Sequence, residues 1–162
     1  MNLNNLQTLE DFRFWAKKKL PKMVFGYIDG GAGEGLATKR NIQSFKELLL
    51  QPKTLLNVKN RSQSKNINNQ EFTYPFGIAP MGLCNVSNPK ADIMLAQSAK
   101  RQNIPLCVST AASTSVEDIY KIASKNVWFQ LYMGSTIEST LKLVKRVEKT
   151  GVKNLIISVD VP

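Results

Sequence analysis

Short apolar runs alternate with amphipathic stretches along the chain from residue 75 onward. The apolar runs cover residues 76–80, 106–109, 127–132 and 155–159. The stretches between them repeat apolar residues at helical spacing and cover residues 89–102, 114–123 and 135–151. Runs that are apolar nearly throughout are typical of parallel strands that helices cover. The alternation therefore predicts βαβ units that build a parallel sheet.

Start and stop signals support two of these helices. Thr114 and Glu117 have the spacing of a capping box, in which two side chains satisfy free N–H groups at the start of a helix. Ser135 and Glu138 repeat this spacing before the last helical stretch, and Gly151 is placed to end it. We therefore expect helices to begin at these two positions.

The N-terminal part of the chain predicts further helices. Thr8 and Asp11 indicate the start of a helix whose apolar positions extend to Leu20. Pro21 then interrupts this pattern and is well placed to open a second helix over residues 22–28.

A third helix is expected over residues 37–45. The stretch 48–73 is polar and predicts an irregular connection with one short hairpin. We therefore divide the chain into an N-terminal helical segment with its connection, residues 1–74, and an α/β region, residues 75–162.

Two α/β architectures satisfy this order of elements, a doubly wound sheet and a TIM (β/α)8 barrel. The first apolar run ends in Ala79-Pro80-Met81-Gly82, without the glycine-rich turn of a dinucleotide-binding sheet, and this favours the barrel. A complete barrel takes about 250 residues. Four parallel strands with three intervening helices, preceded by N-terminal helices, correspond to the first half of such a barrel.

Composition narrows the classes of function. The 162 residues carry a formal net charge of +10, but the lysines are spread along the chain without a nucleic-acid-binding motif, so we expect no nucleic-acid partner. Cys84 and Cys107 lack the spacing of metal ligands and predict buried free thiols and no metal site. The N-terminus does not resemble a signal peptide, which predicts a cytoplasmic location. Histidine is absent, so no imidazole can act as a general base.

In a barrel, the chemistry lies where the strands end at their carboxyl side. Here each apolar run ends in, or is followed by, polar or backbone-exposing residues, which are Gly82, Ser109, Gln130, Tyr132 and Ser158. Each residue alone has an ordinary explanation as a helix cap, a solvent-facing amide or a packed tyrosine. A ring of such groups at four consecutive strand ends is not needed by a packed core, and it predicts a ligand site.

Six blocks of sequence occur in a family-specific order and spacing. They are Leu20-Pro21-Lys22-Met23-Val24 with Tyr27 and Gly30-Gly31-Ala32; Asn41 and Phe45 with residues 50–55; and residues 78–82, 109–117, 128–132 and 158–162. Over residues 9–162 the chain resembles the FMN-dependent α-hydroxy-acid dehydrogenases and oxidases. This family includes glycolate oxidase, lactate oxidase, mandelate dehydrogenase and L-lactate dehydrogenase.

The resemblance implies a role for each matched position. The backbone of Ala79, Pro80, Met81 and Gly82 would lie along the flavin of FMN, and Ser109, Gln130 and Ser158 would hydrogen-bond its polar edge. Tyr27 and Tyr132 would bind a small 2-hydroxy acid substrate. A flavin needs a flat apolar face and a few donors and acceptors around its rim, so these residue types suit it.

Three positions depart from the family pattern. Ser158 replaces the usual threonine but keeps the hydroxyl. Asn88 replaces the histidine of a block that opens a helix and does not carry the base. Gly82 stands where many oxidases have alanine, and this favours a dehydrogenase that passes electrons to an acceptor other than oxygen.

The family's general-base histidine, arginines, flavin-proximal lysine and phosphate-binding loops belong to the second half of the barrel. The resemblance therefore implies an enzyme that oxidises an L-2-hydroxy acid of the lactate or glycolate type to the 2-oxo acid. We expect the isolated chain to be inactive, because no catalytic base precedes Pro162. The alternative is a non-catalytic half-barrel that binds flavin or a partner chain. A homo-oligomer is expected of the full-length enzyme, with membrane association only through its second half.

Overall fold

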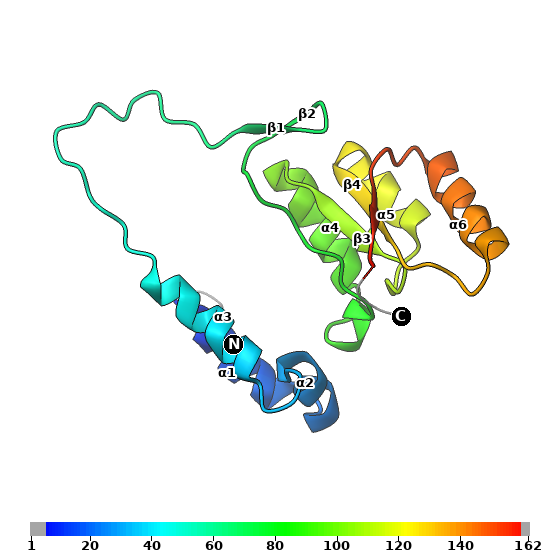
Figure 1. Cartoon of the computed structure of the whole chain (residues 1–162), viewed down its shortest axis with the longest axis horizontal. Coiled ribbons are helices and arrows are strands. Elements are labelled where there is room, and N and C mark those ends of the chain that lie inside the picture. The colour runs from blue at the N-terminus through cyan, green and yellow to red at the C-terminus, as the bar shows by residue number, and fades with distance from the viewer. Residues whose placement is uncertain (1–5, 160–162) are drawn as a thin grey trace. The chain divides into compact units, whose positions relative to one another are not determined.

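The structure is a computed structural model that describes residues 6–159 (Figure 1). The chain forms two compact units, one that extends to Asn60 and one that begins at Arg61. Residues 61–74 therefore pack with the α/β region. No helix among residues 6–159 is both long and apolar enough to cross a membrane.

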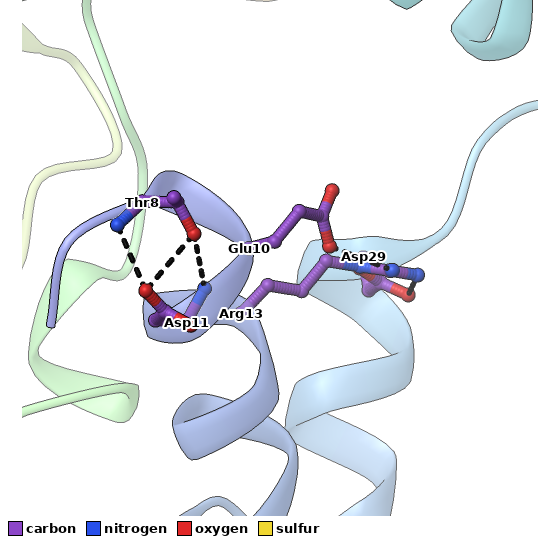
Figure 2. A network of polar contacts seen from close by, with 5 residues as sticks. All are labelled: Thr8, Glu10, Asp11, Arg13 and Asp29. Atoms are coloured by element: carbon purple, nitrogen blue, oxygen red, sulfur yellow. Dashed lines mark hydrogen bonds and ion pairs between the residues drawn. The ribbon is translucent and has the colours of Figure 1, made fainter.

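Three helices form the first unit: α1 (Leu9–Lys19), α2 (Lys22–Asp29) and α3 (Leu36–Glu47). The capping box that starts α1 is present, as Figure 2 shows, with the Thr8 N–H donating to Asp11 Oδ2 at 2.8 Å. Hydrogen bonds from Thr8 lower the pKa of Asp11, so the carboxylate remains charged next to the helix N-terminus. These features confirm the predicted start of the first helix.

A charged pair joins α1 to α2 within this unit. The Arg13 guanidinium donates from Nη2 to Asp29 Oδ2 at 2.9 Å (Figure 2). The hydrogen bond from Arg13 lowers the pKa of Asp29. No residue of α1, α2 or α3 is buried, and this pair is itself partly exposed.

The predicted hairpin lies in the second unit, where β1 (Lys65–Ile67) pairs antiparallel with β2 (Gln70–Phe72). Asn68 and Asn69 form its turn with φ angles of 52° and 61°, and a two-residue turn with two positive φ angles is what a tight hairpin requires. The side chain of Phe72 is fully buried, and its ring packs edge-to-face on Trp128. The hairpin thus packs on the sheet described next.

The sheet consists of β3 (Leu106–Ser109), β4 (Val127–Leu131) and β5 (Leu155–Ile157), all parallel and in chain order. The predicted first strand, residues 76–80, is reduced to a single parallel bridge between Ile78 and Leu106. Prolines at both ends of that segment lack the N–H that a ladder needs, which keeps the pairing short. The segment still lies beside β3, in the position of the first strand of a barrel.

Gly77 allows this close approach. A Cβ atom at Gly77 would lie 2.6 Å from the carbonyl oxygen of Pro105, the residue before β3. The contact is too short for any side chain, so only glycine lets the two backbones meet. The Ile78 N–H donates to that same carbonyl at 2.8 Å.

Three helices connect the strands: α4 (Ala91–Gln102), α5 (Val116–Ala123) and α6 (Ile137–Thr150). Short 3-10 turns occupy Cys84–Val86 and Ser124–Asn126. The caps of α5 and α6 are Ser115 and Thr136, each one residue after the predicted position. Adjacent hydroxyl residues offered two candidate caps in both places, and the second was used. Gly151 ends α6 with a φ of 100°, as predicted.

The core lies between the sheet and these helices. It is built from alternate residues of β3 and β4 and from the inner faces of α4, α5 and α6, and its largest fully buried apolar side chain is Ile119 of α5. Leu106, Val108, Val127, Phe129 and Leu131 face the helices. The intervening strand residues face the opposite side, which in a closed barrel is the interior. The sheet order, the parallel pairing and the helical cover confirm the predicted partial barrel.

Candidate functional site

A row of hydrogen bonds connects the carboxyl ends of the three strands. Ser109 ends β3, Gln130 is the penultimate residue of β4, and Ser158 follows β5. The Ser109 hydroxyl donates to Gln130 Oε1 at 3.0 Å, and Gln130 Nε2 donates to Ser158 Oγ at 3.0 Å. Sequence analysis selected these three residues separately, and the parallel register brings them side by side.

The amide of Gln130 is held in one orientation. Its side chain is 1% exposed. Its oxygen accepts from the Ser109 hydroxyl and, at 3.4 Å, from the Thr110 N–H. The Ser109 oxygen in turn accepts from the Ala111 N–H at 3.1 Å. The Gln130 nitrogen therefore points along the row toward Ser158, and among residues 6–159 it makes this one hydrogen bond of the two that an amide NH2 group can donate.

The loop after the first extended segment lies against the end of β3. The Leu83 N–H donates to the carbonyl of Ala111 at 3.0 Å. A Cβ atom at Gly82 would lie 3.2 Å from the Cβ atom of Ala111, so the glycine marks a close approach of the two loops. Ala79 and Met81 line a small cavity of about 20 Å³ together with Ser109. The Ala79–Gly82 segment is thus adjacent to the hydrogen-bonded row.

The two tyrosines predicted to bind substrate lie in different units. Tyr132 follows β4 directly, its side chain is 40% exposed, and its N–H donates to Thr110 Oγ1 at 3.1 Å. Tyr27 lies in α2 of the N-terminal unit and is 80% exposed. The structure therefore brings Tyr132 to the strand ends, whereas the position of Tyr27 toward a substrate stays a prediction.

Two polar residues near the strand ends were given no role from the sequence, although Thr110 lies in one of the matched blocks. Thr110 bonds to Gln130 and Tyr132, and its position directly after an apolar run was the available signal. Asp92 is 7% exposed and accepts from the Thr114 N–H at 2.9 Å. For Asp92, the available signal was an acidic residue on the face of α4 that packs on the core.

The cysteines near this end of the sheet are not activated nucleophiles. Burial raises the pKa of the Cys107 thiol to about 11. Burial, followed by the nearby Asp92 carboxylate, raises the pKa of Cys84. Both thiols are therefore protonated at neutral pH and unreactive.

A larger cavity of about 1030 Å³ lies at the other end of the sheet. It is lined by polar residues of the hairpin region and by Asn103 and Lys125, which precede β3 and β4. Barrel chemistry belongs to the carboxyl ends of the strands, so we assign the site to the Ser109–Gln130–Ser158 row.

The residues at the strand ends fit the polar rim of a flavin. The row offers a buried amide N–H and hydroxyl groups at one edge of the sheet, and Gly82 leaves backbone without a side chain beside it. A flavin requires donors and acceptors around its pyrimidine ring and close contact with its flat face. The donor set and the cradle therefore agree with FMN.

Known proteins are similar to this chain over nearly its whole length. The sequence profile of the FMN-dependent dehydrogenase family matches residues 16–162. The (S)-mandelate dehydrogenase of Pseudomonas putida is 35% identical over 157 residues, which cover 97% of this chain and 40% of that enzyme. The 2-hydroxyacid oxidase 2 of Rattus norvegicus is 34% identical over 158 residues and is covered to 45%. The chain thus spans about two fifths of the length of these curated relatives.

Solved structures show the same fold. A mutant of an active chimera of (S)-mandelate dehydrogenase superposes with a TM-score of 0.90 at 35% identity, over 97% of this chain and 44% of that one. A mutant flavocytochrome b2 superposes with a TM-score of 0.91 at 32% identity, over 100% of this chain and 42% of that one. The profile match and these relatives confirm the family, and with it the family cofactor FMN, that the sequence blocks predicted. The chain belongs to the FMN-dependent dehydrogenase family.

Proposed function

We propose that this chain forms one wall of an FMN site in an enzyme that oxidises a small L-2-hydroxy acid to the 2-oxo acid. The observation that carries the proposal is the row of hydrogen bonds from Ser109 through Gln130 to Ser158, across three parallel strand ends. When bound, FMN supplies an acceptor for the two electrons that leave the substrate carbon. The chain's own residues bind and orient the cofactor and the substrate, and they exclude water from the site.

Gln130 has the central role in this proposal. Its amide is buried and held from both sides, so its free N–H points in a set direction without reorganisation when a ligand arrives. A preorganised donor in a water-poor site stabilises charge that develops on a ligand oxygen more strongly than a mobile donor does. Ser109 and Ser158 would extend this polar edge.

Tyr132 and Tyr27 are proposed to donate their phenol O–H groups to the substrate. A short 2-hydroxy acid offers a carboxylate and a hydroxyl, and both accept hydrogen bonds from phenols. Relatives are named for mandelate, lactate and 2-hydroxy acids, which share this pair of groups. We extend to this chain the recognition of this carboxylate and hydroxyl pair, and not of one particular acid.

The oxidation also needs a base that takes the hydroxyl proton, and this chain has no histidine. General acid–base catalysis is worth about 10²–10⁴-fold in rate. We propose that the chain alone does not turn over and that the base comes from the remaining part of the barrel. L-lactate and an electron-accepting dye should then yield no 2-oxo acid above the buffer level.

Gly82 supports a dehydrogenase in preference to an oxidase. Without a side chain at this position, more space is left beside the flavin face than in oxidases that carry alanine. This space changes how oxygen reaches the flavin. Because the neighbouring Ala111 lies so close, this space is set by two small residues together.

A titration of the purified chain with FMN, followed by flavin fluorescence, tests the proposed cofactor wall. Binding is expected, and Gln130→Leu should weaken it about tenfold through the loss of the amide donor. Gln97→Leu, at an exposed position of α4, is the matched control and should leave affinity unchanged. A folded chain that does not bind FMN would contradict the proposal. An equal loss of FMN affinity in both variants would contradict it as well.

One observation favours the second candidate, a non-catalytic half-barrel that binds a partner chain. Leu155 and Ile157 of β5 are 42% and 52% exposed, and an uncovered parallel edge readily pairs with another chain. A stable, colourless dimer in light scattering that excludes FMN would favour this candidate over the flavin wall.

A further inference from the structure

Thr110 contacts both residues to which the proposed function assigns a ligand. It follows β3 directly, as Tyr132 follows β4. The Thr110 hydroxyl donates to the carbonyl of Gln130 at 2.7 Å and accepts the Tyr132 N–H at 3.1 Å. One side-chain oxygen therefore joins the backbone on both sides of Leu131, at the point where the chain leaves the sheet.

The register explains why this contact matters. Ser109 pairs with Gln130, and the Thr110 N–H continues the ladder to the Gln130 carbonyl at 3.0 Å. The next N–H in line, that of Tyr132, finds the Thr110 hydroxyl as its acceptor. The hydroxyl thus extends the pairing of β3 and β4 by one side-chain bond beyond the strands, and Tyr132 is held in line with the sheet.

Thr110 also acts on the Gln130 amide. Its N–H lies 3.4 Å from Gln130 Oε1, on the same oxygen that accepts from Ser109. Both donors favour the orientation in which the Gln130 nitrogen faces Ser158. Through its backbone and its hydroxyl, Thr110 constrains the side chain of one ligand residue and the backbone of the other.

We propose that Thr110 is a positioning residue that fixes Gln130 for the flavin edge and Tyr132 for the substrate while touching neither ligand. The inference rests on the proposed function for the roles of Gln130 and Tyr132. The latch itself, meaning the two bonds of the Thr110 hydroxyl, is independent of that function and can be tested separately.

Thr110→Val removes the hydroxyl at nearly constant shape, and Thr110→Ser retains it. Amide hydrogen exchange on the full chain should show the Tyr132 N–H exchanging about tenfold faster in the valine variant, equivalent to about 1.4 kcal/mol, and nearly unchanged in the serine variant. Thr114→Val is the matched control, because no hydrogen bond of its hydroxyl is among the contacts of residues 6–159. Equal exchange in the valine variant and the unmodified chain would overturn the latch.

FMN titration of the same variants tests the positioning role. Thr110→Val should weaken binding severalfold and shift the absorption bands of the bound flavin, since a displaced Gln130 donor changes the flavin environment. A loss of folded protein alone would lower the bound fraction without shifting those bands. Serine should restore both signals. Faster exchange with unchanged affinity and bands would overturn positioning, whereas failure of the unmodified chain to bind FMN would count against the proposed function and leave the exchange result to decide the latch.

Discussion

At the scale of single residues, the site depends on close contacts between small groups. Gly82 is the clearest case, because its φ angle lies outside the left-handed region and the three atoms nearest to an added Cβ all belong to Ala111. A substitution at this position therefore tests steric space without adding backbone strain.

Gly82→Ala is expected to destabilise the second unit by about 1 kcal/mol, since an added methyl 3.2 Å from the Ala111 Cβ atom forces the two loops apart. Urea unfolding followed by circular dichroism measures the change. Adding Ala111→Gly to this variant should recover part of the loss, beyond the effect of Ala111→Gly alone. Strict additivity of the two substitutions would show that the loops do not meet as described.

At the scale of elements, the hairpin β1–β2 has one buried side chain, that of Phe72. Phe72 is fully buried against Trp128, so Phe72→Ala should cost about 3 kcal/mol of unfolding free energy and detach the hairpin from the sheet. Phe76→Ala, at a residue that is 60% exposed, should cost far less. Trp128 fluorescence reports detachment, and similar losses in both variants would mean that the hairpin does not anchor through Phe72.

Helices α5 and α6 are joined by a bidentate pair, in which Arg146 donates to Glu117 at 2.6 and 2.8 Å. The hydrogen bond from Arg146 lowers the pKa of Glu117 below its ordinary value of 4.5. A carboxyl with a depressed folded-state pKa adds stability above its unfolded pKa and loses it as the pH falls through the folded value. The urea concentration at the unfolding midpoint should therefore decrease as the pH is lowered below 4.5.

Glu117→Gln should make this acid dependence shallower, because the variant side chain does not titrate. Glu148→Gln on α6 is the control, since no hydrogen bond or ion pair of its side chain is among the contacts of residues 6–159, and it should keep the slope of the unmodified chain. Identical slopes in all three proteins would assign the acid sensitivity to other carboxyls.

Sequence patterns predicted most elements, and the exceptions have physical causes. Helices and buried strands were visible from their apolar spacing, and Gly151 from its place after the last helix. The caps of α5 and α6 shifted by one residue because neighbouring hydroxyls compete. Residues 76–80 form an apolar run but pair with β3 through a single bridge. The prolines lack the N–H donors that a ladder needs, and a hydrophobic pattern does not show this. Thr110 lies in a matched block but was given no role, because its role depends on the register of β3 against β4, which no single segment shows.

At the scale of the whole molecule, the β5 edge is the least covered part of the sheet. Ile157 pairs with Leu131, so it faces the same side as that core residue, yet it is 52% exposed while Leu131 is 2% exposed. The difference arises because helices cover β4 on this side and do not cover β5. An apolar parallel edge of this kind favours pairing with other chains.

Ile157→Lys should therefore reduce self-association of the chain, measured as the concentration dependence of light scattering, because a lysine on an edge strand opposes strand addition. Leu141→Lys is the matched control: Leu141 is 51% exposed on α6, away from the sheet edge. If exposed apolar area in general drives association, both variants disperse the protein equally. If the β5 edge drives it, only Ile157→Lys does so. The second outcome would identify this edge as the surface that the remainder of a barrel, or another chain, has to cover before the strand-end site is enclosed.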